Sequence, residues 1–313
     1  MTSKKKLIVA MWLAFAAGLP AQSLQDARAL LDGGNLREAR SAFELLLASD
    51  ATNRDAQLGE LEVCERMALE HRAHGMNNEA LEDLFRAKTM VPNLPRLYYD
   101  MGVLEDEMEL FHDADLALAE AEARGMKEPE LYYAQARVKM DLGQLAPAEE
   151  KMLAYLKQRP NDAGAHYGLG RVYQIGLQIE KARAEFERSI ALQPHQTEAF
   201  FELGDLALKQ SDYATALGFY QKTLALDPNH GGALEGSGEV YYKLKQYQQA
   251  YDVLKHAVAV SPEYPPCHYY LGLTLNRLGR REEGQQELTR AARMTEEANA
   301  RGAMRLQNQN AVQ

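Results

Sequence analysis

Residues 163–196 read AGAHYGLGRVYQIGLQIEKARAEFERSIALQPHQ, and this stretch decides the fold. Apolar or aromatic residues recur at helical spacing in its first half, at Tyr167, Leu169, Val172 and Tyr173. Small and aromatic residues do so again in its second half, at Ala182 and Phe186. The stretch therefore predicts two short amphipathic helices joined by a turn.

Residues of three types return with a period of 34 along the rest of the chain. The glycine series is Gly102, Gly170, Gly204, Gly238 and Gly272. The alanine series is Ala80, Ala114, Ala148, Ala182, Ala216 and Ala250. The proline series is Pro92, Pro160, Pro194, Pro228 and Pro262. Three residue types that share one period indicate stacked structural repeats.

Each series has a physical reason. A small residue where two helices cross lets their backbones approach, and larger side chains such as Phe186 and Tyr220 fill the space beside it. Gly143 can take the left-handed conformation that ends a first helix, as can Gly279. The first helical turn tolerates proline, which places helix starts at Pro95, Pro129 and Pro265.

The chain resembles tetratricopeptide repeat proteins. The family pattern is met by Leu169-Gly170, Tyr173, Ala182, Phe186 and Pro194, and it is met again one unit later. The resemblance covers nearly all of the chain after residue 21. It implies an all-α, right-handed superhelical solenoid of stacked antiparallel helix pairs, with first helices on the concave side and second helices outside.

We expect eight units in a solenoid spanning residues 22–306. Their bounds are 22–53, 54–94, 95–128, 129–162, 163–196, 197–230, 231–264 and 265–298. Because 41 residues instead of 34 separate Ala39 from Ala80, the first helix of the second unit is predicted to be elongated, over 54–74. The last helix is predicted to continue through Thr295–Arg305 as a polar cap, and residues 307–313 to be frayed.

The N-terminus predicts export. Three lysines at positions 4–6 precede a thirteen-residue apolar run, Leu7 to Leu19, and a small residue at Ala21. This is the pattern of a secretory signal peptide, here residues 1–21. The run is shorter than the about 20 residues of a membrane span. We expect a cleaved signal, no membrane span after cleavage and a bacterial periplasmic or secreted location, with an uncleaved anchor as the alternative.

The formal net charge of −10, without a basic stripe, argues against a nucleic-acid partner. Cys64 and Cys267 lie six repeats apart, too far for a disulfide in a stacked array, so both are expected to be buried thiols.

Candidate partner-binding residues come from two stripes on the first helices. One stripe is mostly aromatic and directly follows a position assigned to the core; the other lies four residues further along the same face. The candidates from the two stripes are Tyr99, Tyr133, Arg137, Tyr167, Arg171, Phe201 and Tyr269. Glu235 interrupts the aromatic stripe. Aromatic residues with arginine beside them are typical of binding hot spots.

Packing between neighbouring first helices explains the same aromatic stripe, so both interpretations stand. Family members that grip a peptide carboxylate do so with lysine and asparagine. This chain has aromatic residues, valine and arginine at the corresponding positions, so that specificity is not carried over.

No motif for catalysis or cofactor binding is present in the sequence. His71 and His74 share a helical face, but no third metal ligand accompanies them. The leading hypothesis is a non-enzymatic exported scaffold that binds an extended segment of another protein. The alternatives are a glycan-binding or polysaccharide-secretion accessory protein, which the resemblance also allows, and a structural subunit that assembles through its outer face or its ends.

Overall fold

The computed structural model describes residues 23–311. The predicted signal peptide lies outside the described residues.

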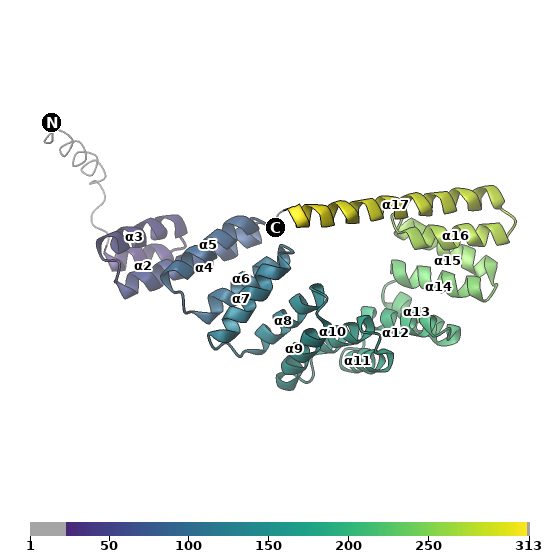
Figure 1. The fold of residues 1–313 in the computed structure, drawn as a ribbon, viewed down its shortest axis with the longest axis horizontal. Helices are drawn as coiled ribbons and strands as arrows, with labels where there is room; N and C mark the ends of the chain where they lie inside the picture. Colours follow the sequence, from purple (N-terminus) through teal and green to yellow (C-terminus); the bar gives the residue numbers. More distant parts are fainter. Residues whose placement is uncertain (1–22, 312–313) are drawn as a thin grey trace, which may run out of the picture. The chain divides into compact units, whose positions relative to one another are not determined.

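The described residues form sixteen α-helices, α2 to α17, and no strand (Figure 1). The first helices of the pairs are α2 (Leu24–Asp32), α4 (Arg54–Ala73), α6 (Pro95–Glu107), α8 (Pro129–Asp141), α10 (Ala163–Ile175), α12 (Thr197–Lys209), α14 (Gly231–Lys243) and α16 (Pro265–Arg277). The second helices are α3 (Leu36–Ser49), α5 (Asn77–Met90), α7 (Phe111–Ala123), α9 (Leu145–Gln158), α11 (Ile179–Leu192), α13 (Tyr213–Leu226), α15 (Tyr247–Val260) and α17 (Arg281–Ala311). The prediction of an all-α fold of stacked helix pairs is confirmed.

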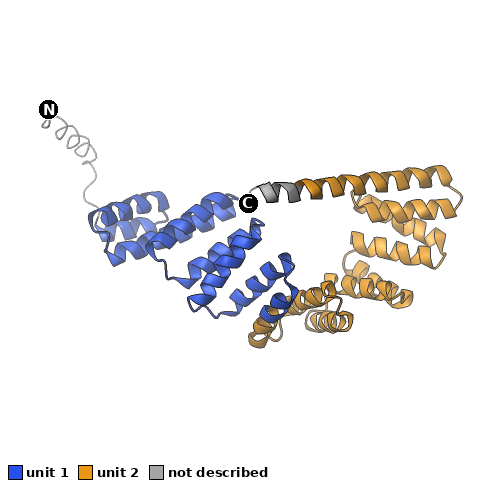
Figure 2. Ribbon diagram, viewed as in Figure 1, with its two compact units in different colours: residues 1–151 blue, residues 152–313 orange. Residues whose placement is uncertain are grey.

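The chain forms two compact units, residues 1–151 and 152–313, which we call unit 1 and unit 2 (Figure 2). The described part of unit 1 contains α2 to α8 and the start of α9. Unit 2 contains the end of α9 and the helices from α10 onward. Each unit is described by itself below.

Small residues lie where the helices of a pair cross, as predicted. A Cβ atom added to Gly170 would be 2.6 Å from the Phe186 ring, and one added to Gly204 would be 2.6 Å from the Tyr220 ring. Real Cβ atoms do not come this close to another heavy atom. Glycine is therefore required at these crossings, because the ring of the second helix occupies the space of a side chain.

The turn between the helices of a pair contains one residue with a left-handed backbone. Gly143 (φ 71°) and Gly279 (φ 83°) confirm the prediction for these positions. The same turn position elsewhere holds residues with side chains, namely Glu109, Leu177, Ser211 and Lys245. The geometry of the turn is therefore set by the helix pair and not by glycine alone.

Helix starts and lengths follow the sequence signals. Pro95, Pro129 and Pro265 each lie in the first turn of a helix. α4 has 20 residues whereas α6 has 13, which confirms the elongated first helix. α17 has 31 residues and continues through the predicted cap, and the helix includes residues 307–311 of the segment predicted to be frayed.

Cys64 and Cys267 are both buried free thiols, as expected. Burial raises the pKa of each thiol to about 12, so neither is a reactive thiolate at neutral pH. Among the helices of residues 23–311, none combines the length and the apolar character needed to cross a bilayer.

Candidate partner-binding surface

The candidate residues all lie on first helices, and several consecutive first helices touch. In unit 1, α2 contacts α4 and α6 contacts α8; in unit 2, α14 contacts both α12 and α16. Second helices contact the first helix of the following pair, as α13 does with α14. We call the surface made by the first helices within a unit the first-helix face; in unit 2 it is continuous from α12 through α14 to α16.

In unit 1, the candidate residues take part in contacts between charged groups and rings. The guanidinium of Arg96 lies 4.8 Å from the centre of the half-buried Tyr99 ring. Arg137, whose side chain is 50% exposed, lies 2.8 Å from a carboxylate oxygen of the buried Asp106 on the preceding first helix. Tyr133 is half-buried. Arg137 thus has a structural partner, and half of its side chain remains open to solvent.

In unit 2, the structure brings Tyr167 and Arg171 together as predicted. Arg171 donates a hydrogen bond to the Tyr167 hydroxyl at 3.3 Å and lies 3.5 Å from the carboxylate of Glu202 on α12. The Tyr167 ring packs 5.7 Å from the Phe186 ring. Tyr167 is therefore half-buried, with a ring that packs on α11 and a hydroxyl that accepts a hydrogen bond from Arg171.

The remaining two aromatic candidates differ in exposure. The Phe201 ring packs against Tyr220 and His230, with ring centres 6.2 Å and 4.7 Å away. Tyr269 is 47% exposed and meets Tyr270 edge to face. Phe201 is thus mainly a packing residue, whereas Tyr269 offers an accessible ring.

The face of unit 2 also carries carboxyl groups that the sequence stripes did not select. Asp205 accepts a hydrogen bond from the Tyr220 hydroxyl at 2.7 Å. Burial, opposed by this bond, raises the pKa of Asp205 to about 6. Burial and the nearby charges of Glu239 and Asp205 raise the pKa of Glu235 to about 8. An acidic region therefore interrupts the aromatic stripe between Phe201 and Tyr269.

Unit 1 contains a pocket on the same face, which we call the α4–α6 pocket. It has a volume of ≈ 310 Å³. It is lined by Glu65, Ala68, Leu69, Arg72, Leu84, Arg96, Asp100 and Leu104. The sequence stripes missed it because they began at Tyr99. Val103 is the residue of the second stripe that lies four positions after Tyr99. The period of 34 extended one unit back leads from Tyr99 to Glu65 and from Val103 to Leu69, so the signal was present in the sequence.

The two carboxyl groups of the pocket, Glu65 and Asp100, both have raised pKa values. Burial is the largest cause that raises the pKa of Asp100, and the adjacent Arg96 opposes it. Burial also raises the pKa of Glu65, and Asp100 raises it further. Negative charge in the pocket is thus incompletely neutralised by the arginines.

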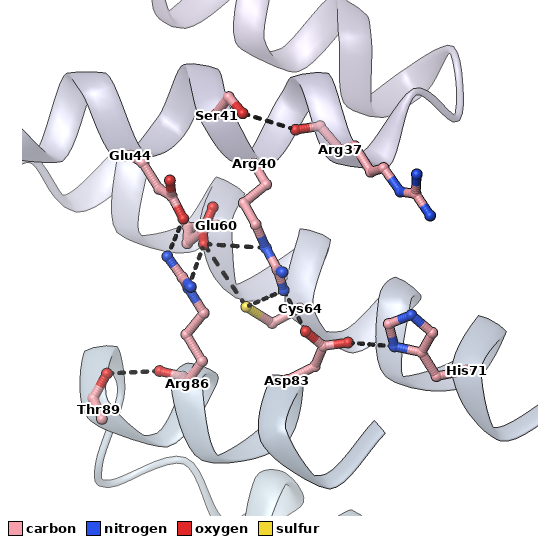
Figure 3. Close-up of polar contacts among 10 residues, drawn as sticks. All are labelled: Arg37, Arg40, Ser41, Glu44, Glu60, Cys64, His71, Asp83, Arg86 and Thr89. Atoms are coloured by element: carbon pink, nitrogen blue, oxygen red, sulfur yellow. Dashed lines mark hydrogen bonds and ion pairs between the residues drawn. The ribbon is translucent and has the colours of Figure 1, made fainter. Parts of the chain in front are cut away.

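His71 belongs to a network of ionisable side chains. Its Nδ1 atom lies 2.8 Å from Asp83, which also binds Arg40 (Figure 3). Arg40 and Arg86 both reach the buried Glu60, so the network joins α3, α4 and α5. Within residues 23–311, no group of three potential metal ligands is found.

Comparison with known proteins identifies the repeats. The profile of the tetratricopeptide repeat family matches residues 133–174 and 177–231. A profile described as anaphase-promoting complex, cyclosome, subunit 3 matches residues 209–291. The region spanning residues 133–231 therefore contains tetratricopeptide repeats. No curated protein matches it.

Solved structures share the fold. A tetratricopeptide repeat protein from Parabacteroides merdae has a TM-score of 0.63 and 16% identity, over 75% of this chain and 93% of that chain. PilF of Pseudomonas aeruginosa has a TM-score of 0.57 and 15% identity, over 67% of this chain and 96% of that chain. MamA from Desulfovibrio magneticus has a TM-score of 0.52 and 21% identity, over 55% of this chain and 97% of that chain. At these identities the likeness shows the fold alone.

Proposed function

We propose that this chain is a non-enzymatic exported scaffold that binds an extended segment of a partner protein on its first-helix faces. The observation that carries the proposal is the α4–α6 pocket, an apolar-floored hollow on that face with charged groups around it. A few polar groups around an apolar hollow are typical of binding sites.

The half-exposed side chains of the stripes support the same proposal. Tyr269 and Arg137 remain accessible although each also contacts a neighbouring residue of the chain. Tyrosine and arginine held in place by such contacts lose little conformational entropy when a partner binds.

A protein partner fits these observations better than a glycan. Stacking on a sugar requires an open aromatic face. Arg96 lies over the Tyr99 ring and Phe201 packs against Tyr220 and His230, so neither ring is open, although Tyr269 is 47% exposed. The charged and apolar groups of the α4–α6 pocket suit peptide side chains.

Export is part of the proposal and rests on the N-terminal sequence, where three lysines precede the apolar run Leu7 to Leu19. Its test is the intact mass of the protein recovered from the periplasm of a bacterial host. A mass that lacks residues 1–21 supports export and cleavage. Full-length protein found only in the cytoplasm contradicts them.

Site-specific crosslinking tests the binding surface. A photo-reactive phenylalanine analogue is placed at Tyr99, Tyr133 or Tyr269 on first helices. For comparison it is placed at Leu116 or Leu153, exposed residues of second helices. We expect one discrete protein adduct from the first-helix positions and none from the second-helix positions. Equal adducts from both sets would remove the first-helix face as the binding surface.

A further inference from the structure

The α4–α6 pocket has an apolar floor that reaches into the core of unit 1. Ala68, Leu84 and Leu104 line it and are each less than 10% exposed. Leu69, on the rim, is 64% exposed. Covering such an exposed aliphatic side chain with another apolar group removes apolar surface from water, which is favourable in free energy.

The two arginines of the pocket already have partners. The Nε atom of Arg96 donates to both carboxylate oxygens of Asp100, at 3.0 and 3.2 Å. Arg72 donates two hydrogen bonds to Glu107, the one from Nε at 2.8 Å. An anionic ligand would have to break these pairs and approach the remaining carboxylates.

Glu65 differs from the other charged residues of the pocket. Across the described residues it has no hydrogen bond or ion pair, although it lies half-buried on the wall of the pocket. With Glu107 included, three carboxylates face two guanidinium groups, so the pocket carries one excess negative charge. The complementary ligand therefore brings a positive charge to Glu65.

We propose that the α4–α6 pocket binds a bulky aliphatic side chain of the partner segment, and that Glu65 binds a lysine or arginine next to it. This assignment rests on the proposed function and names the chemistry of its partner. The volume of ≈ 310 Å³ suits one or two side chains and not a folded element. The aliphatic group covers Leu69 and the floor, while its basic neighbour completes the charge balance at the rim.

Raised pKa values agree with this geometry. A cation at Glu65 would lower the pKa of both Glu65 and Asp100, so binding should release protons and weaken as the pH falls through the raised pKa values.

The test uses the full chain and an array of decapeptides in a serine and glycine background. The central pair of residues combines leucine, methionine or serine with lysine, arginine, glutamine or glutamate. We expect the full chain to prefer leucine or methionine followed by lysine or arginine. Replacing the basic residue by glutamate, or the aliphatic residue by serine, should remove the signal.

Three variants assign the signal to the pocket. Glu65→Gln should lower the affinity for the basic peptides by about three- to tenfold, because it removes a half-exposed charge. Leu69→Ser should lower it by a similar factor, since less apolar surface is buried. Glu70→Gln is the matched control, because Glu70 is exposed on α4 and does not line the pocket. Circular dichroism confirms that each variant is folded.

A preference for acidic peptides, an unchanged affinity in Glu65→Gln, or the absence of any peptide signal would overturn the assignment. The proposed function fails separately, when crosslinking from Tyr99, Tyr133 and Tyr269 yields no specific adduct. Specific adducts together with a preference that ignores Glu65 would retain the scaffold and reject only the chemistry proposed for this pocket.

Discussion

In unit 2, rings and leucines of second helices fill the space over glycines of first helices, whereas in unit 1 charged side chains also cross between helices inside the fold. Tyr220 over Gly204 represents the first arrangement. Arg40, which bridges Asp83 and Glu60 across three helices, represents the second (Figure 3). Apolar packing is destabilised when a side chain becomes too large, whereas a buried charge network is destabilised when one of its charges is removed.

The pocket lies in the unit that carries the charge network. α4 supplies both Glu60 of the network and Glu65 of the pocket. The elongated helix α4 therefore has two roles. Its Glu60 pairs with arginines of α3 and α5, and its Glu65 lies on the wall of the pocket. Unit 2 has no such helix among its first helices, which all have 13 residues.

Asp83→Ala should have the largest effect and should destabilise unit 1. Asp83 is 5% exposed and is the partner of both Arg40 and His71, so its loss leaves a partly buried guanidinium without one of its partners. Breaking such a pair costs about 3 kcal/mol. Urea unfolding followed by hydrogen exchange of amides in each unit measures the effect.

Glu44→Ala is the control for Asp83→Ala. It removes the exposed ion pair to Arg86 and should cost less than about 1 kcal/mol. Similar losses in the two variants would show that the buried network does not distinguish unit 1.

Ala216→Leu should have the next largest effect and should destabilise unit 2. Ala216 is fully buried beside Tyr220, so added carbon atoms have no free space. Overpacking of this kind costs about 1–3 kcal/mol. Ala225→Leu on the same helix is exposed and should leave the melting temperature nearly unchanged. Equal melting temperatures for both variants would refute the packing account of the glycine and alanine series.

The two units should also differ in their response to pH. Burial raises the pKa of Glu105 in unit 1 to about 7 and, with nearby carboxylates, the pKa of Glu235 in unit 2 to about 8. Both values lie above the ordinary 4.5, so the folded state holds these protons more tightly. The stability that they contribute is present below pH 4.5 and is lost as the pH rises through 7 in unit 1 and through 8 in unit 2.

Glu105→Gln and Glu235→Gln measure this difference. Each should flatten the pH dependence of its own unit, by about 1–2 kcal/mol over the window for the nearly buried Glu105. Amide hydrogen exchange at several pH values separates the units. A slope unchanged by both substitutions would assign the pH dependence to other groups.

The sequence predicted what a fixed spacing determines and missed what depends on the partner of a side chain. Gly204 and Tyr220 lie at constant offsets, so their contact followed from the period of 34 residues. The contact of Arg40 with Asp83 spans 43 positions and joins residues of different repeats, so no spacing in the sequence predicts it. Propensity and period locate a face of a helix, but long-range charge pairs depend on packing in three dimensions.

The candidate surface likewise contains contacts that the spacing predicts and contacts that it does not. The period placed Tyr167 and Arg171 on one face, and the structure brings them into contact. It did not predict that Arg137 pairs with Asp106, because the position of Asp106 holds Met140 and Gln174 in the next two units and so has no recurring acidic residue. The α4–α6 pocket was missed because the candidate stripes began at Tyr99, although Glu65 and Leu69 lie one period earlier and continue both stripes.

The smallest predicted effect concerns the turn, where both units share one backbone geometry with different residues. Leu177 in unit 2 has φ 56°, and its side chain is 80% exposed. The left-handed conformation of this residue therefore costs free energy that side-chain packing does not offset. Gly143 occupies the same position in unit 1, with no heavy atom near an added Cβ. Leu177→Gly should therefore stabilise unit 2 by about 0.5–1 kcal/mol, and Gly143→Leu should destabilise unit 1 by a similar amount. Because neither change alters a contact, opposite shifts in chemical denaturation would isolate the backbone term. If both variants instead lost stability, Leu177 must contribute packing that its exposure does not suggest.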